Sequence, residues 1–90
     1  MTKTMILGQE HDQNLRDTLM EVLRQLGASI TSRNRAIAGS QEIETVVLQL
    51  AGKEITIEAE TYVGLSITGD EKVINEISER VRQAIRSIQS

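Results

Sequence analysis

Residues 42–68 read EIETVVLQLAGKEITIEAETYVGLSIT, and apolar and polar residues alternate along most of this stretch. A period of two is typical of β-strands that bury one face. A two-residue turn at Ala51 and Gly52 would join two antiparallel strands. The turn pairs Leu48 with Ile55 and gathers the apolar side chains of both strands on one face. We expect this register because a shift by one residue would place glutamates among the leucines and isoleucines.

The alternation keeps its parity through residues 53–68, whereas strands usually have ~5–6 residues. Residues 61–63 include no residue that commonly forms turns, so we expect one long strand with a bulge at Gly64 rather than a hairpin. At ~3.3 Å per residue this strand would reach roughly 50 Å, which is more than one compact domain of this size needs. Either this strand bends sharply near Gly64, or its far half projects beyond the sheet and pairs with a second chain, which would cover the apolar side chains of Val63, Leu65 and Ile67.

A further strand is predicted upstream, over residues 29–38. A three-residue loop at residues 39–41 would join it to the strand that follows. This loop would direct Ile30 toward the core and both Arg33 and Arg35 toward solvent.

Two amphipathic helices flank the strands. The first spans residues 12–26, with Asp12 as its N-cap and Gly27 as the residue that ends it. Its apolar stripe consists of Leu15, Leu19, Val22, Leu23 and Leu26. The second helix follows Thr68 and Asp70, which compete as N-caps. Its apolar face consists of Val73, Ile74, Ile77, Val81, Ala84, Ile85 and Ile88.

These patterns predict a helix, three antiparallel strands and a second helix, with an optional short strand at residues 4–7 in front. Both helices cover one face of the sheet. The expected fold is therefore an α+β two-layer sandwich of three or four strands in the order (β)αβββα. Because 90 residues suffice for one core only, we expect a single domain over residues 1–90.

The composition excludes several classes of protein. The 10 basic and 13 acidic residues give a net charge of −3, which provides no sequence-wide attraction to phosphate. There is no cysteine, so disulfides, thiolate chemistry and cysteine-based zinc sites are excluded. The longest apolar runs have three residues, too few for a membrane span or a secretory signal, and we expect a cytoplasmic protein.

No group of residues has the pattern of a catalytic, cofactor or metal site, and we expect neither an enzyme nor a bound cofactor. His11 lies between Glu10 and Asp12, but neighbours in an extended segment cannot all face one ion. Ser66 lies in a sequence similar to a nucleophile elbow, yet the alternation places it inside a strand. Three carboxylates fall on the solvent side of the same strands, namely Glu54, Glu58 and Glu60.

Arg33 and Arg35 form the one basic cluster outside the last helix and support an alternative function, a nucleic-acid- or ribosome-associated module. The order helix, three strands, helix occurs in double-stranded-RNA-binding domains, which grip phosphates with basic residues at the start of the second helix. Here that helix begins with Asp70 and Glu71, which repel phosphate. Tyr62 is the only aromatic residue, so bases have no stacking platform.

We therefore expect a non-enzymatic, self-associating protein that acts through contacts with other proteins. A small domain with an aliphatic core and no staples often gains stability by association. We expect a two-fold homodimer in which each chain covers the projecting half-strand of the other. The residues predicted to make this contact are Tyr62, Val63, Leu65 and Ile67.

Overall fold

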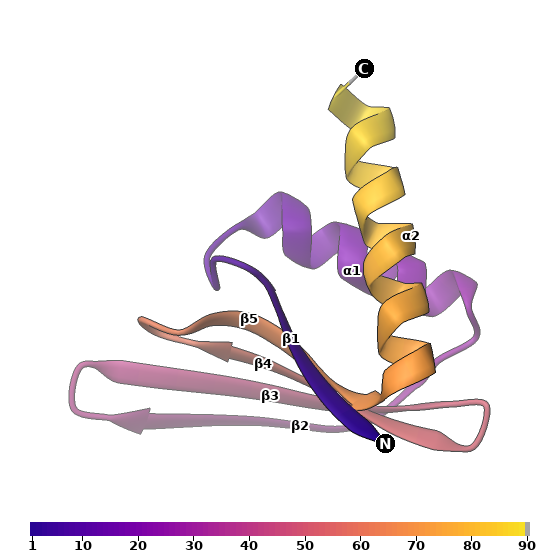
Figure 1. Cartoon of the computed structure of the whole chain (residues 1–90). Coiled ribbons are helices and arrows are strands. Elements are labelled where there is room, and N and C mark those ends of the chain that lie inside the picture. The colour runs from indigo at the N-terminus through magenta and orange to yellow at the C-terminus, as the bar shows by residue number, and fades with distance from the viewer. Residues whose placement is uncertain (90) are drawn as a thin grey trace.

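The computed structural model describes residues 1–89, which form a five-stranded antiparallel sheet with two helices on one of its faces (Figure 1). In chain order the elements are β1 (Thr2–Gly8), α1 (Gln13–Gln25), β2 (Ser29–Ala38), β3 (Gln41–Leu50), β4 (Lys53–Glu60), β5 (Gly64–Asp70) and α2 (Glu71–Gln89). The α+β class is confirmed. The strand number and the element order were predicted wrongly, since the order is βαββββα.

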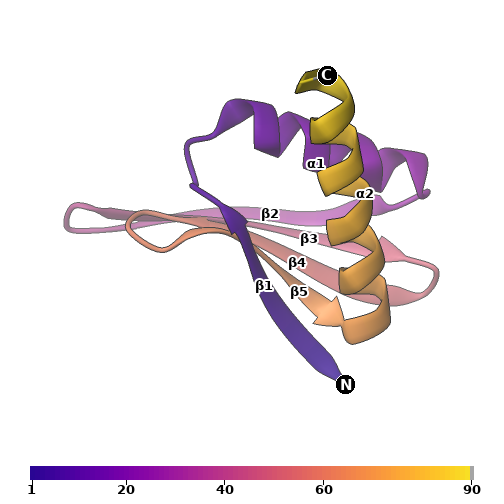
Figure 2. The same cartoon turned by 45° about the horizontal axis from the view of Figure 1, so that its top comes forward.

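Helix α1 links the two edges of the sheet. The strand order is β1-β5-β4-β3-β2, so the strands before and after α1 are the two outermost ones. The chain crosses the sheet through α1 and then returns strand by strand from β2 to β5, which pairs with β1. Both helices lie on the same side, and neither covers the opposite face (Figures 1 and 2).

The core between the helices and the sheet is aliphatic, as predicted. Leu19 of α1 and Ile77 of α2 are fully buried. The buried apolar side chains are Leu15, Leu19, Val22, Leu23, Leu48, Ile55, Ile57, Leu65, Ile67, Ile74, Ile77 and Val81. The predicted pairing of Leu48 with Ile55 is confirmed.

The helix ends follow the expected chemistry. Asp12 caps α1, because its Oδ1 accepts a hydrogen bond of 3.1 Å from the Leu15 amide. Gly27 ends the helix with a positive φ of 89°. At α2 the Asp70 carboxylate accepts a bond of 3.4 Å from the Val73 amide, whereas Thr68 lies within β5. Asp70 is therefore the N-cap of α2.

The predicted single strand over residues 53–68 is wrong, because the chain reverses at residues 61–63 to form the β4–β5 hairpin. Tyr62 adopts a φ of 72°, and the Val63 amide donates to the Glu60 carbonyl at 3.1 Å. Non-glycine residues rarely adopt a positive φ, so the sequence carries no signal for this turn. Gly64 follows with a φ of 124°, and a Cβ there would lie 2.5 Å from the Gly8 carbonyl oxygen.

The hairpin removes the projecting half-strand on which the predicted dimer depended. Leu65 and Ile67 are 2% and 0% exposed inside the core of their own chain. They therefore need no second chain to cover them. Tyr62 and Val63 remain exposed at the turn.

Arg33 and Arg35 are exposed as predicted, but the face of the sheet predicted for them is wrong. The β2–β3 turn has two residues rather than three, so that Ala38 pairs with Gln41. Arg33 then pairs with Val46, and Arg35 with Glu44. These partners lie on the face that the helices cover, and the two arginines share it. A β-bulge between Ile30 and Ser32 restores the pairing of Ile30 with Leu48, so Ile30 faces the core side as predicted.

Candidate functional site

A groove runs between α1 and the edge strand β2. It contains two hollows of about 100 and 400 Å³ that share Met20 of α1 as a common wall. The larger hollow lies near the start of β2, where Met20, Leu23 and Leu48 surround Ile30. The smaller one lies under the first turns of α1, with Arg16 and Arg33 at its wall. We call this feature, defined by these residues, the α1–β2 groove.

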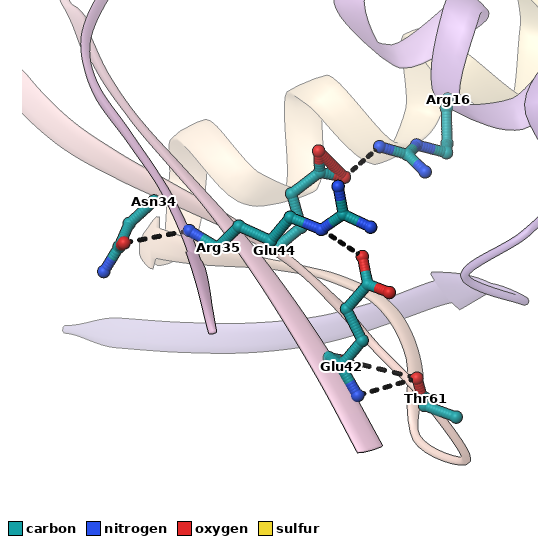
Figure 3. Close-up of polar contacts among 6 residues, drawn as sticks. All are labelled: Arg16, Asn34, Arg35, Glu42, Glu44 and Thr61. Carbon is teal, nitrogen blue, oxygen red and sulfur yellow. Dashed lines mark hydrogen bonds and ion pairs between the residues drawn. The ribbon is translucent and has the colours of Figure 1, made fainter. Parts of the chain in front are cut away.

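A cluster of charged side chains lies beside the smaller hollow (Figure 3). Arg16 of α1 forms an ion pair with Glu44 of β3. On the neighbouring strand the Arg35 Nε lies 2.6 Å from the Glu42 Oε1. Hydrogen bonding to Glu42, together with its negative charge, raises the pKa of the Arg35 guanidinium above its usual value. Both arginines are thereby held by carboxylates of the same chain.

Arg33 differs from its two neighbours. Among the described residues 1–89, no carboxylate lies within ion-pair distance of Arg33, whereas Arg16 and Arg35 each have one. Its side chain is exposed, yet it contributes to the wall of the smaller hollow. The groove therefore has an apolar floor and the unpaired positive charge of Arg33 beside the smaller hollow, while the α1 side of the larger hollow carries Asp17, which accepts a hydrogen bond from the neutral Gln13.

Strand β2 offers a free backbone edge along the groove. It pairs with β3 alone, and all ten of its residues are exposed. The Arg35 amide donates to the Asn34 Oδ1 at 2.9 Å and so points away from β3. Because amides alternate in direction along an antiparallel strand, those of Arg33 and Ile37 point the same way.

A second exposed feature lies at the end of the sheet that carries the β2–β3 and β4–β5 turns (Figure 1). Tyr62 is 83% exposed, Ile37 69% and Val63 49%. We call these three residues the sheet tip. Thr61 anchors this end, since its amide donates to the Glu42 carbonyl at 3.0 Å and its hydroxyl accepts from the Glu42 amide at 3.0 Å (Figure 3).

The remaining sequence candidates are not brought together. His11 is exposed beside Glu10, with 3.8 Å between the His11 Nδ1 and a carboxylate oxygen. Ser66 lies within β5 and pairs with Glu58, on the face that the helices leave uncovered. Within residues 1–89 no three potential ligands are grouped to hold a metal ion.

No helix in the described part of the chain has the length and apolar character required to cross a membrane. Comparison with protein-family models, curated proteins and solved structures returned no match. The function is therefore inferred from the surfaces described above.

Sequence reasoning missed the groove, although two signals for it are present. Met20 is an apolar residue outside the main stripe of α1, and it forms the wall between the two hollows. Glu44 has the same strand parity as Val46 and Leu48, which marks a carboxylate on an otherwise apolar face. Both residues lie where the helix-covered face changes from apolar to charged.

Proposed function

We propose that the protein is a non-enzymatic, cytoplasmic homodimer that acts through contacts with other proteins. The observation that supports this most is the sheet tip, where the only aromatic residue of the chain is 83% exposed and two further exposed apolar side chains, Val63 and Ile37, lie at the same end of the sheet. Exposed aromatic residues grouped with aliphatic ones are typical of contact surfaces, because they bury large areas when a partner binds.

The backbone of Tyr62 adds to this support. A left-handed conformation costs free energy in a non-glycine residue, and such conformations concentrate at binding sites. Thr61 holds the turn through its hydrogen bonds to Glu42, so the Tyr62 side chain is presented from a fixed backbone. A fixed backbone loses less conformational entropy when it binds.

The proposed dimer contact is formed by Tyr62, Val63 and Ile37. Leu65 and Ile67 are omitted because their own helices cover them. A two-fold arrangement would place the sheet tips of two copies against each other, which is the usual geometry of small homo-oligomers.

Light scattering tests this proposal at micromolar concentrations. We expect the wild-type chain of 10.0 kDa to have a mass that rises toward 20 kDa with concentration, twice the chain mass. The Tyr62→Ser/Val63→Ser variant should dissociate roughly tenfold more readily, as expected for an interface anchor. Ile30→Ser serves as a matched control, since Ile30 is a partly exposed residue at the other end of β2. A monomeric wild-type protein, or a dimer that the double substitution leaves intact, would contradict the proposal.

The alternative function in nucleic-acid binding now rests on Arg33, because Arg35 is neutralised by Glu42. If a single-stranded RNA or a DNA duplex binds, we expect Arg33→Ala to weaken binding and to reduce the salt slope by about one charge. Binding at physiological salt that survives Arg33→Ala/Arg35→Ala would contradict the assignment of this surface.

A further inference from the structure

The free edge of β2 and the α1–β2 groove are arranged for the same ligand. The amides of Arg33, Arg35 and Ile37 point outward from the sheet. An extended segment placed there would receive backbone hydrogen bonds as a sixth strand. Successive side chains of a strand alternate between the two faces, so every second side chain of that segment would lie on the helix-covered side, beside the groove.

The larger hollow defines one position of such a ligand. Its volume is about 400 Å³, and its apolar lining comes from Met20 and Leu23 of α1, Ile30 of β2 and Leu48 of β3, with Asp17, Glu21 and Arg24 of α1 at its rim. This is enough space for an aliphatic side chain, whose burial favours binding.

Arg33 defines the neighbouring position. The bulge places Arg33 on the same face as Ile30, since their partners on β3, Val46 and Leu48, are two residues apart. No carboxylate of the described residues forms an ion pair with Arg33. An acidic side chain two residues away from the aliphatic one would lie opposite Arg33. The groove thus matches an extended segment in which an aliphatic and an acidic residue share one face.

A second copy of β2 fits this edge poorly. Two copies paired around a two-fold axis would have their helices on the same side of a continuous sheet. If most residues of the two β2 strands are paired, Arg33 of one copy lies opposite Arg33 or Arg35 of the other. Like charges at directly opposite positions destabilise strand pairing. The bulge beside Ile30 and the Asn34 side chain on the Arg35 amide also protect the edge from unselective pairing.

We propose that β2 binds an extended, acidic segment of another protein as a sixth strand, with one aliphatic side chain in the α1–β2 groove and one carboxylate on Arg33. This surface is separate from the sheet-tip contact proposed for the dimer. It would operate equally in a monomer.

A peptide array provides the test. The probes are capped heptapeptides of threonine in which positions two and four vary over all residues, and the fluorescently labelled protein is the analyte. We expect the strongest binding from peptides with one aliphatic and one acidic residue at these positions. Replacement of the threonine at position six by proline should weaken binding, because this position has the same amide direction as positions two and four, and proline removes that donor from the ladder.

Variants of the protein identify the site. Arg33→Glu should weaken binding of the acidic peptides about tenfold and shift the preference to lysine or arginine. Arg80→Glu, an equivalent change on the exposed face of α2, should leave the preference unchanged. Asn34→Ala frees the Arg35 amide and should strengthen binding. The Tyr62→Ser/Val63→Ser variant should bind as the wild type does, which separates this proposal from that of the dimer.

Three outcomes would overturn the proposal. The first is an array without any peptide that binds above the all-threonine control. The second is a preference that Arg33→Glu leaves unchanged. The third is peptide binding that disappears as the protein concentration rises in the Tyr62→Ser/Val63→Ser background, since β2 would then be occupied by a second copy.

Discussion

Tyr62 illustrates how a single residue decides part of the fold without a signal in the sequence. The β4–β5 turn requires a left-handed backbone at this position, and glycine or asparagine would have indicated it. The hydrogen bonds from Thr61 to Glu42 help to hold this conformation, and these residues lie 19 positions apart. A contact of such sequence separation is invisible to local pattern reasoning, which is why a strand that continues through residues 61–63 was predicted.

Tyr62→Gly should therefore separate backbone strain from binding. Glycine adopts a positive φ without steric cost, so we expect the free energy of unfolding to stay the same or to rise by up to ~1 kcal/mol. Self-association should weaken in the same variant because the aromatic side chain is lost. Urea unfolding and light scattering measure the two effects.

Gly64→Ala is the opposite case. Its Cβ would collide with the Gly8 carbonyl oxygen, and its φ of 124° disfavours alanine. We expect clear destabilisation in urea. An alanine variant as stable as the wild type would show that β1 and β5 do not approach as closely as described.

At the scale of elements, the helices and the β3–β4 hairpin were predictable because one local signal determines each. The apolar stripe of α1 and its Asp12 cap are complete within a few turns, and Gly52 between two alternating segments indicates a tight turn, in which Ala51 and Gly52 both have a positive φ. The β2–β3 register was not predictable in the same way. The sequence around Gly39 is compatible with a loop of two or three residues, and that choice determined which face Arg33 occupies.

The junction of β5 and α2 gives a prediction about acid stability. Burial alone would raise the pKa of the Asp70 carboxyl, but the hydrogen bond from the Val73 amide and the nearby Lys53 ammonium lower it below its usual value. The Lys53 Nζ lies 3.4 Å from the Asp70 Oδ1. A lowered pKa in the folded state means that Asp70 stabilises the protein above its usual pKa, and that this stabilisation is lost as the pH falls through the lowered value.

Asp70→Asn should accordingly lower the urea midpoint at pH 7 and have a smaller effect at an acidic pH below the lowered pKa, where the Asp70 carboxyl is protonated. In a Lys53→Met background the difference at pH 7 should shrink, because one source of the lowered pKa is absent. An Asp70→Asn effect that is equal at both pH values would contradict this role of the carboxylate.

For the whole molecule, the uncovered face of the sheet distinguishes two classes of apolar residue. Leu19 and Ile77 lie between the helices and the sheet, and both are fully buried. Val47 belongs to the inner strand β3 and pairs with Thr56 on the face without helices. Apolar residues therefore contribute to stability according to the face of the sheet on which they lie.

Truncation measures this difference. Leu19→Ala or Ile77→Ala should cost about 2–5 kcal/mol in urea unfolding, as buried aliphatic side chains do. Val47→Ala should cost much less, because its side chain is partly in solvent and leaves no enclosed cavity. Equal losses at Ile77 and Val47 would refute the two-layer arrangement.

The pairing of β1 with β5 also has a consequence for how the chain acquires its structure during synthesis. Residues 2–8 leave the ribosome before residues 65–70, which are their strand partners. Helix α1 and the strands that follow it can form while β1 has no strand partner. The apolar side chains of Met5 and Leu7 then remain exposed to solvent until β5 has been synthesised. Strand β1 is thus among the last strands to gain a partner, although it is synthesised before the other four. The delay equals the time needed to translate the residues between β1 and β5.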